Sequence, residues 1–344
     1  MAVTNSPKTA RKGGRLLKQL LAPLVGDASP VTVIGLCKNA GKTTAMRRLM
    51  AELGEECLGL TSVGRDGECT DLVTGTEKPD LYLKKGDLFA TARGMLTLCD
   101  ATLEVVDLTD VMTPLGPVAV FRTLSDGYVQ LAGPSAAGQL PPLTRRFQEL
   151  GAQRVLIDGA AGRKSLAGAG VEGVALLCTG ASLDRDMELV VAETAHTCWL
   201  FARKRPESAA LCAALDGQEA RFPEGEPVEL PLEESGAPKW NKLPRRPLVL
   251  WAAGGIMDPL LKTLARRGAP TTLVAADATH VLAGRAALDL FLRNGGELRV
   301  RRELTIAAVG ANPWSAYGWH FEPDKFVRAL REVIDLPVVN VKED

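Results

Sequence analysis

The sequence predicts an α/β protein built around a mostly parallel sheet. Short apolar runs rich in β-branched residues alternate along the chain with stretches of helical periodicity, which is the order of strand-helix-strand units. The 344 residues, 46% of them hydrophobic and 24% charged, suffice for a sizeable core and for two domains of unequal size. We therefore expect a larger α/β domain followed by a smaller C-terminal α/β domain.

The first strand and the first helix are predicted from residues 31–53. Residues 31–36 form a short β-branched run of the kind that is buried on both faces of a parallel sheet. Residues 42–53 have helical spacing, and Gly54 stands at the position of a C-terminal cap. The apolar stripe of this helix comprises Ala45, Met46, Leu49, Met50 and Leu53.

We interpret the connection between this strand and this helix as a phosphate-binding loop of the type G-x-x-x-x-G-K-[ST]. Its sequence is GLCKNAGKT, from Gly35 to Thr43. Glycines let successive backbone N–H groups point at one anion, and the start of the helix adds the positive end of its dipole. The predicted nucleotide contacts are Gly35, Lys38, Asn39, Ala40, Gly41, Lys42, Thr43 and Thr44. The alternative is an ordinary glycine turn that leads into a helix with a solvated lysine.

Three side chains have distinct predicted roles at this site. Lys42 is the cation that would reach the β- and γ-phosphates, and the hydroxyl of Thr43 would join the shell of a Mg²⁺ ion. The strand at 155–157 leads into Asp158, and α/β sheets bind their ligands at the carboxyl ends of strands. We expect Asp158 to complete the Mg²⁺ site; the alternative is an aspartate that caps a turn or a helix.

Two further loops carry candidate site residues. In TSVGRDGE, Arg65 and Asp66 lie between glycines at a strand end, where they could sense a γ-phosphate or hold a substrate. Asp66 is the best available general base, and a surface turn is the alternative. Beyond the strand that ends at Asp158, Arg163 and Lys164 could stabilise phosphate charge, or could belong to a solvated loop.

Charge, hydropathy and cysteine usage narrow the class of protein. Lys plus Arg equals Asp plus Glu at 41 each, so no overall field favours nucleic acid. No apolar run approaches ~20 residues, so we expect no membrane span, and the N-terminus lacks the features of a secretory signal. The seven cysteines are scattered without C-x-x-C spacing, as expected of reduced thiols in a cytoplasmic protein. One of them, Cys37, lies in the loop, where a thiol would make activity sensitive to oxidation or alkylation.

The expected organisation has four parts. Residues 1–29 are a basic N-terminal segment, either a helix that docks on a partner or an anionic surface, or a frayed terminal helix. Residues 30–204 form the domain with the phosphate-binding loop, and 205–247 form a connector rich in proline, glycine and charge. Residues 248–344 form the C-terminal α/β domain.

Two local features are expected inside the larger domain. Residues 87–98 have helix-like periodicity. Two extended runs flank Ser125-Asp126-Gly127, a turn signal that predicts a β-hairpin inserted in the otherwise parallel sheet.

Aromatic residues are unevenly distributed in the C-terminal part of the chain. The chain has five tryptophans and three tyrosines, and three of these residues are Trp314, Tyr317 and Trp319, with His320 beside them. The cluster is either a contact surface or pocket rim, or a satellite core beneath a proline turn. Residues 241–244, NKLP, approach the guanine-reading motif N-K-x-D but have Pro244 in place of the carboxylate, so ATP and GTP both stay open as the nucleotide.

Two resemblances extend these expectations. The loop and first helix are similar to those of the MobB-type GTPases of molybdopterin-guanine-dinucleotide synthesis. Over most of the chain, the segments IGLCKNAGKTT, GLTSVGRDGE, RTLSDGYVQLAGPS, VLIDGAAGRKSLA and NPWSAYG resemble the reactivase subunit associated with lysine 5,6-aminomutase. That resemblance implies a P-loop NTPase domain, with phosphate and Mg²⁺ roles for Lys42, Thr43 and Asp158. It also implies a partner, because in that family nucleotide hydrolysis helps to eject damaged cobalamin from a B₁₂-dependent aminomutase, together with a second, MutS-like ATPase subunit.

The sequence also differs from related patterns, and other functions stay open. A P-loop of the MinD type has a signature lysine at the position of Cys37, and no D-x-H-x-x-G segment of a cobalamin-binding fold is present. One alternative is a kinase, a ligase or a cofactor-biosynthesis GTPase that acts on a small molecule. Another is a nucleotide-gated binding module with negligible turnover.

Overall fold

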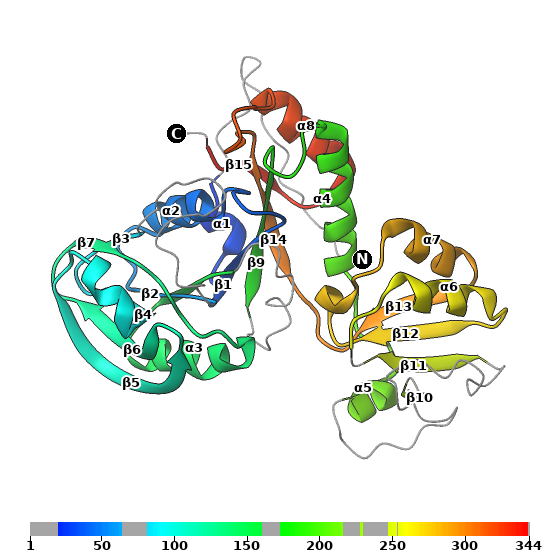
Figure 1. The fold of residues 1–344 in the computed structure, drawn as a ribbon, viewed down its shortest axis with the longest axis horizontal. Helices are drawn as coiled ribbons and strands as arrows, with labels where there is room; N and C mark the ends of the chain where they lie inside the picture. The colour runs from blue at the N-terminus through cyan, green and yellow to red at the C-terminus, as the bar shows by residue number, and fades with distance from the viewer. Residues whose placement is uncertain are drawn as a thin grey trace, which may run out of the picture.

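The fold is α/β with a mostly parallel central sheet (Figure 1). It comes from a computed structural model that describes residues 20–63, 81–159, 173–215, 228–229, 247–252 and 254–342. Nine strands form the central sheet, and four others form a separate sheet beside it. Helix α4 (Met187–Phe201) lies between the two sheets in Figure 1.

The central sheet has the strand order β15-β14-β9-β1-β8-β2-β4-β6-β5. Neighbours from β15 to β4 pair in parallel, and β6 runs antiparallel to both β4 and β5. In that order the strands are Val338–Asn340, Ile306–Asn312, Val174–Gly180, Val31–Gly35, Arg154–Asp158, Leu58–Ser62, Leu88–Ala92, Gly116–Thr123 and Leu103–Thr113.

Helices cover both faces of this sheet because its strands alternate between two apolar sides. On one side, Val33 and its neighbours pack against Met46 and Leu49 of α2 (Lys42–Leu53), with α1 (Ala22–Val25) alongside. On the other side, Ile34 joins the core that contains Val190 of α4 and Phe326 of α8. Helices α3 (Leu140–Glu149) and α8 (Pro323–Val333) cover this second side with α4. The strand β1 therefore lies at the centre of a three-layered arrangement.

Side chains of helix α2 form hydrogen bonds with two other parts of the chain, the start of α1 and the end of β15. Glu52 accepts hydrogen bonds from the main-chain N–H groups of Leu21 and Ala22 at 2.6 and 2.8 Å, which satisfies donors at the start of α1. Arg48 forms an ion pair with Glu52 at 2.9 Å and donates to the carbonyl oxygen of Asn340 on β15. These contacts hold the helix that begins at Lys42 in a defined position over the sheet.

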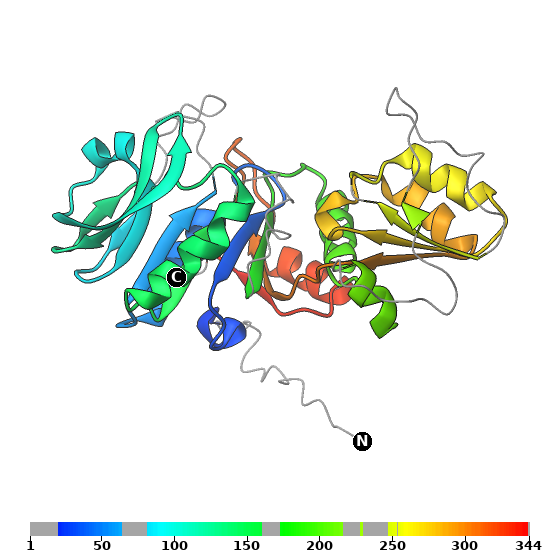
Figure 2. The ribbon, with the colours of Figure 1, turned by 90° about the horizontal axis from the view of Figure 1, so that it is seen from below.

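The second sheet is built entirely from parallel strands, in the order β10-β11-β12-β13. Its strands are Val228–Glu229, Leu248–Ala252, Thr271–Ala275 and Gly296–Val300, and its helices are α5 (Ala209–Leu215), α6 (Asp258–Arg266) and α7 (Arg285–Arg293). Figure 2 shows this unit as a separate lobe beside the central sheet.

The second unit is an insertion, and this corrects the expected boundaries. The chain leaves the central sheet after α4, forms β10 to β13, and returns to pair β14 with β9 and β15 with β14. The predicted domain 248–344 is therefore divided, and its last part completes the domain predicted as 30–204. The reason is that IAAVGAN and PVVNV are suited to any buried parallel position, and their spacing says nothing about which sheet they join.

Two local predictions in the larger domain are wrong. Residues 88–92, expected in a helix, form β4 between β2 and β6, and a 3₁₀ helix (Arg93–Leu98) follows. All five β4 residues are buried, so pairing with two neighbouring strands overrides the helix-like spacing. The hairpin lies earlier than predicted, between β5 and β6 with its turn at Pro114 and Leu115. The turn at Ser125-Asp126-Gly127 instead leads to β7 (Gly127–Val129), which pairs with β3 (Leu81–Leu83).

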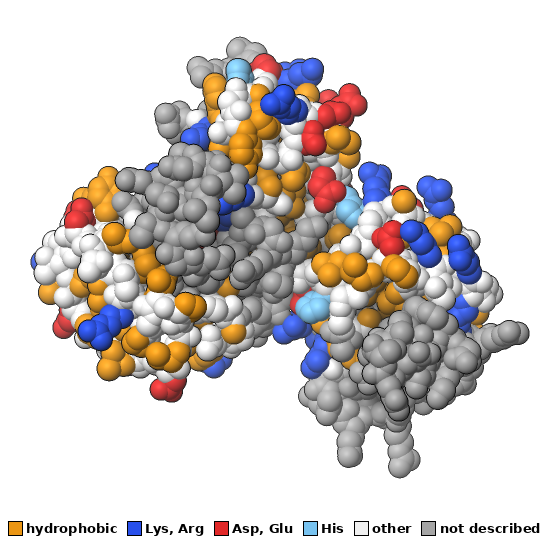
Figure 3. Space-filling model, viewed as in Figure 1, with side chains coloured by type: hydrophobic (Ala, Val, Ile, Leu, Met, Phe, Trp, Pro, Cys, Tyr) orange, Lys and Arg blue, Asp and Glu red, His pale blue; other side chains and the backbone are white. Residues whose placement is uncertain are grey.

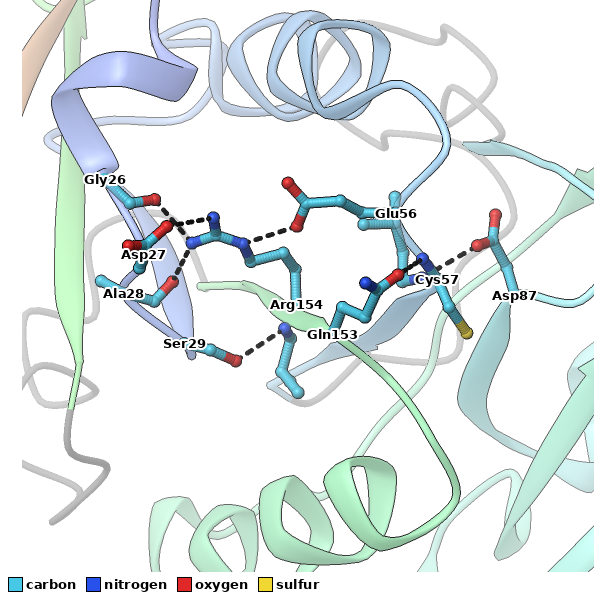
Figure 4. Close-up of polar contacts among 11 residues, drawn as sticks. Gly26, Asp27, Ala28, Ser29, Glu56, Cys57, Asp87, Gln153 and Arg154 are labelled. Atoms are coloured by element: carbon cyan, nitrogen blue, oxygen red, sulfur yellow. Dashed lines mark hydrogen bonds and ion pairs between the residues drawn. The ribbon is translucent and has the colours of Figure 1, made fainter.

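The amino edge of the central sheet is clamped by Arg154, the first residue of β8 (Figure 4). Its guanidinium donates to a carboxylate oxygen of Glu56 at 2.6 Å and to the carbonyl oxygens of Gly26 and Ala28 at 2.6 and 3.1 Å. A carboxylate oxygen of Asp27 lies 3.3 Å away. The Arg154 side chain is buried, so this network joins the segment before β1, the loop before β2 and the start of β8.

Neighbouring side chains extend the same connection across the edge. The hydroxyl of Ser29 accepts from the N–H of Val155 at 3.0 Å, and the amide oxygen of Gln153 accepts from the N–H of Cys57 at 2.8 Å. The buried carboxylate of Asp87 accepts from the N–H of Leu58 at 2.9 Å, and its burial raises its pKa. Side chains thus fix the starts of four parallel strands, β1, β2, β4 and β8, at the amino edge of the sheet. The loops that follow these strands lie at the opposite, carboxyl edge.

No helix within the described ranges is long and apolar enough to cross a membrane. Residues 1–19, which carry the basic residues of the predicted N-terminal segment, lie outside the described part, as does most of the predicted connector at 205–247.

Candidate functional site

The loop after β1 is a tight turn that leads directly into α2. Leu36 still belongs to the sheet, because its N–H donates to the carbonyl oxygen of Cys178 on β9 at 2.9 Å. Two of the next five residues adopt left-handed conformations, Asn39 with φ of 60° and Gly41 with φ of 95°. Helix α2 starts at Lys42, directly after Gly41. Successive turns of this kind direct backbone N–H groups toward a single concave space at a helix start.

The match to G-x-x-x-x-G-K-[ST] is inexact, which corrects the interpretation of the sequence. Five residues, not four, separate Gly35 from Gly41, so Leu36 stands where the pattern has its first glycine. Leu36 needs no special conformation, because its N–H continues the ladder with β9. The loop proper is therefore 37–41. It begins one residue later than the pattern implies.

Gly35 still has a steric role, which concerns Lys42. A Cβ atom at Gly35 would lie 3.0 Å from both Cγ and Cδ of Lys42, and 3.2 Å from the carbonyl oxygen of Cys37. The aliphatic stem of Lys42 thus folds back over Gly35. Glycine is the residue type that allows this close approach.

Asp158 lies beside the loop, at the carboxyl end of β8. It is in register with Val33 of β1 and with Ser62 of β2, and its carbonyl oxygen accepts from the N–H of Val63 at 3.0 Å. Lys42 and Thr43 open α2 after β1, and Asp158 ends β8, the strand next to β1; their joint role in a site stays a prediction.

The buried thiol of Cys178 lies within electrostatic reach of both Lys42 and Asp158. Burial raises its pKa to about 12, the charge of Lys42 acts to lower it, and the charge of Asp158 acts to raise it further. Cys178 is on β9, the neighbour of β1. A cation and a carboxylate thus act on the same point from the loop and from β8.

The oxygen donors present fit Mg²⁺ better than a softer metal. Thr43 lies in the first turn of α2, and Asp158 is half-buried. Magnesium prefers one or two carboxylates together with substrate phosphates and water. No group of three His, Cys, Asp or Glu side chains that could hold a metal ion occurs in the described ranges.

An orphaned donor in the loop also fits a phosphate. The side-chain nitrogen Nδ2 of Asn39 is buried and has no hydrogen-bond partner within the described part of the chain. A buried unpaired donor costs about 1–3 kcal/mol. An acceptor bound in the loop, such as a phosphate oxygen, would remove that cost.

Asn312, which the sequence analysis did not identify, holds the loop from the other side. It ends β14 and is 5% exposed. Its Nδ2 donates to the carbonyl oxygen of Asn39 at 3.2 Å, and its Oδ1 accepts from the N–H of Trp314 at 3.3 Å. Its Cβ would lie 2.9 Å from a Cβ placed on Gly41. A polar residue at the carboxyl end of a strand indicates a candidate ligand-binding position. Only the pairing of β14 with β9, however, brings Asn312 to the loop.

The aromatic cluster follows Asn312 directly and is partly open to solvent. Trp314 stacks on His320, with ring centroids 4.6 Å apart and planes at 22°, and Tyr317 stacks on Trp319 at 5.5 Å. Trp319 donates from Nε1 to the carbonyl oxygen of Ala181 at 2.8 Å. Trp314 is 49% and Tyr317 42% exposed, so these rings do not form a closed core.

Cys37 differs from the reactive thiol expected in the loop. Burial raises its pKa to about 11, and the nearby charge of Lys42 only partly offsets that rise. Because the thiolate is the reactive form, little of it exists near neutral pH. The expectation of marked sensitivity to oxidation or alkylation is therefore not supported.

Several candidate residues lie outside the described part of the chain. These are Arg65 and Asp66, Arg163 and Lys164, and the NKLP segment at 241–244. The first two pairs follow β2 and β8 in the chain, and these two strands are neighbours in the central sheet.

An open groove lies away from these residues, where α4 and α8 approach α7. It is lined mainly by apolar side chains, including Met187 and Val191 of α4 and Val333 of α8, with Arg285 of α7 at its side. Hydrophobic side chains reach the surface around α8 in Figure 3. None of the lining residues is a predicted nucleotide contact.

Comparison of the chain with protein-family models, with curated proteins and with solved structures found no match.

Proposed function

We propose that this chain binds a purine nucleoside triphosphate with Mg²⁺ and hydrolyses it. The observation that carries the proposal is the loop at 37–41, with left-handed residues at Asn39 and Gly41, a lysine stem folded over Gly35, and Asp158 on the adjacent strand. This combination supplies backbone donors, a mobile cation and a carboxylate at one edge of the sheet.

The roles of the residues follow from their positions. Backbone N–H groups of the loop and the start of α2 would bind the β-phosphate, and Lys42 would neutralise charge on the β- and γ-phosphates. Asn39 Nδ2 would donate to a phosphate oxygen. The backbone of the loop is held by Asn312 before the substrate arrives, so it needs little reorganisation as charge builds up on the phosphate oxygens.

Thr43 and Asp158 would hold the Mg²⁺ ion. When bound, the ion supplies charge neutralisation on the phosphate oxygens. The group that orients the attacking water is expected from the loop at 64–80, where Asp66 stays the candidate.

We also propose a partner for this hydrolysis, a B₁₂-dependent aminomutase such as lysine 5,6-aminomutase, with a second, MutS-like ATPase subunit. The support is the resemblance of five segments of the sequence, three of which contribute to the loop, to Asp158 and to the aromatic cluster. In that role, hydrolysis would drive remodelling of the enzyme and release of damaged cobalamin.

The test is steady-state hydrolysis of ATP and of GTP with Mg²⁺, with and without a purified aminomutase that has been inactivated by turnover. Wild type is compared with Lys42→Ala and with Lys262→Ala, which removes an exposed lysine in the inserted unit. We expect hydrolysis in wild type and Lys262→Ala, loss of at least about 100-fold in Lys42→Ala, and a rise when the inactivated enzyme is added.

The outcomes separate the two proposals. Activity that survives Lys42→Ala would overturn the nucleotide site. Activity that depends on Lys42 but ignores the aminomutase would overturn the partner and would favour a kinase or ligase, for which small-molecule acceptors are then screened.

A further inference from the structure

The direction in which a nucleotide would leave the phosphate-binding loop follows from the strand order. Asp158 is on β8, on one side of β1, and β9 and β14 lie on the other side. If the terminal phosphate and its metal ion lie toward Asp158, the nucleoside extends the opposite way, over the ends of β9 and β14. Asn312 ends β14 at that point and contacts the loop through Asn39.

One side chain fixes the distance between the loop and the first aromatic ring. Asn312 donates to the Asn39 carbonyl and accepts from the Trp314 N–H, so the same amide group holds both segments. Trp314 is two residues from Asn312, a span of at most about 7 Å. The aromatic loop therefore begins directly beside the phosphate-binding loop.

The loop from 313 to 320 is also held rigidly against the neighbouring turn. The N–H of Ala316 donates to the hydroxyl of Ser182 at 3.2 Å, and Trp319 donates to the Ala181 carbonyl at 2.8 Å. The guanidinium of Arg185 lies over the Trp319 ring, 4.6 Å from its centroid. These contacts hold the loop before a ligand arrives, which lowers the cost of ordering it on binding.

The Trp314 ring is a stacking surface that the protein leaves half uncovered. It is packed on His320 and is still 49% exposed. Residues 313–320 contain no Asp or Glu, so this loop lacks the carboxylate that would accept the N–H donors of guanine. Stacking on an aromatic face tolerates every base, because every base has a π-face.

We propose that the Trp314–His320 ring pair is the platform for the base of the bound nucleotide, so that the site accepts adenine and guanine alike by stacking. This inference rests on the proposed nucleotide function. It assigns the nucleoside to the aromatic loop and the phosphates to the loop at 37–41, with Asn312 as the positioning residue between them.

The experiment compares ligands with and without a base. Binding of ADP, GDP and inorganic tripolyphosphate to the full chain is measured by calorimetry for wild type, Trp314→Ala and Trp314→Phe. Tyr82→Ala is the matched control, because Tyr82 is also 49% exposed and also contacts a second ring, Tyr128, but lies in the β3–β7 sheet.

We expect Trp314→Ala to weaken ADP and GDP by similar factors, about 5- to 150-fold, as expected for the loss of one stacked base. Tripolyphosphate affinity should stay unchanged, Trp314→Phe should restore most of the nucleotide affinity, and Tyr82→Ala should match wild type for all three ligands.

Three results would overturn the inference. Unchanged ADP and GDP affinity in Trp314→Ala excludes the ring as a base platform. A parallel loss of tripolyphosphate affinity in that variant shows that Trp314 acts only through the structure of the loop. A wild type that binds tripolyphosphate through Lys42 but discriminates strongly between ADP and GDP shows that hydrogen bonds read the base. Failure of tripolyphosphate and both nucleotides to bind wild type instead overturns the proposed nucleotide function, and this inference with it.

Discussion

The side-chain amide of Asn312 donates a hydrogen bond of 3.2 Å to the main-chain carbonyl oxygen of Asn39, across a separation of 273 residues. The bond joins the last residue of β14 to the middle of the loop after β1. Because the inserted unit lies between α4 and β14 in the chain, the bond can form only after the chain has returned to the central sheet.

Asn312→Asp should destabilise the protein and weaken nucleotide binding. One carboxylate oxygen of the new aspartate can still accept from the N–H of Trp314. The other oxygen replaces the donor Nδ2, so two buried acceptors, this oxygen and the carbonyl oxygen of Asn39, face each other. We expect a loss of about 1–3 kcal/mol in the free energy of unfolding, measured by urea denaturation. Asn340→Asp is the control, because the side-chain oxygen of Asn340 accepts from the N–H of Lys342 at an exposed site, which a carboxylate can also do. Equal stability of the two variants would contradict a structural role for the Asn312 amide.

Gly41→Ala should distort the phosphate-binding loop. Gly41 has φ of 95°, and a Cβ there would lie 2.9 Å from Cβ of Asn312 and 3.2 Å from Cγ2 of Val341. Gly151→Ala is the matched control, since Gly151 has φ of 100° and nothing within 4 Å of the added atom. Both variants carry the backbone cost of about 1–3 kcal/mol, and Gly41→Ala carries the added crowding. Thermal denaturation and tripolyphosphate binding measure the difference, and equal behaviour of the two would contradict the crowding.

Arg154→Met should be among the most damaging single substitutions at the amino edge of the central sheet. It leaves the Glu56 carboxylate and the carbonyl oxygens of Gly26 and Ala28 without their donor. Breaking a buried ion pair in this way costs about 3–5 kcal/mol. In Arg146→Met, by contrast, the lost partners are Asp107 and Glu149 at a site where the arginine side chain is 40% exposed. That variant should lose about 1 kcal/mol or less. Guanidinium denaturation of both variants tests the contrast, which fails if their midpoints coincide.

Stability should fall as the pH rises above about 9, in part because of Cys178. Its pKa is raised by burial from 9.0 to about 12, so between these values the unfolded chain loses the proton that the folded chain keeps. The unfolded state then binds fewer protons, and the free energy of unfolding decreases with pH. Cys178→Ala should make this decrease shallower by up to about 1.4 kcal/mol per pH unit. Val309→Ala, on the neighbouring strand β14, should lower stability without changing the slope; the same slope for Cys178→Ala as for wild type would contradict the linkage.

Part of the candidate site could be predicted from the sequence because it depends on local order. The strand from Val31, the loop and the helix that begins at Lys42 are contiguous, so residue spacing alone indicates that a lysine and a threonine open a helix after a tight turn. Asp158 could be predicted for the same reason, since it directly follows a buried-type run. The sequence also shows that five residues separate Gly35 from Gly41, one more than the pattern allows. The structure explains the extra residue, Leu36, as a continuation of β1.

Other features depended on pairing between distant segments. The helix-like spacing of 87–98 carried no sign that β4 would be buried between β2 and β6, and the turn at Ser125-Asp126-Gly127 carried no sign that β7 would pair with β3 instead of folding back on β6. The role of Asn312 was hidden in the same way, because a strand-end asparagine has no partner until the order of strands is known.

The sequence by itself determined the α/β class, the strand, loop and helix from Val31 to Leu53, and the strand that ends at Asp158, since each follows from the periodicity and chemistry of a few consecutive residues. Only the tertiary structure decided that the second sheet is an insertion, that β14 lies beside β9, and that Asn312 and the aromatic loop border the loop at 37–41. The physical reason is that hydrogen-bond ladders between parallel strands are set by packing across the whole sheet, and many apolar strands are equally suited to each position within it.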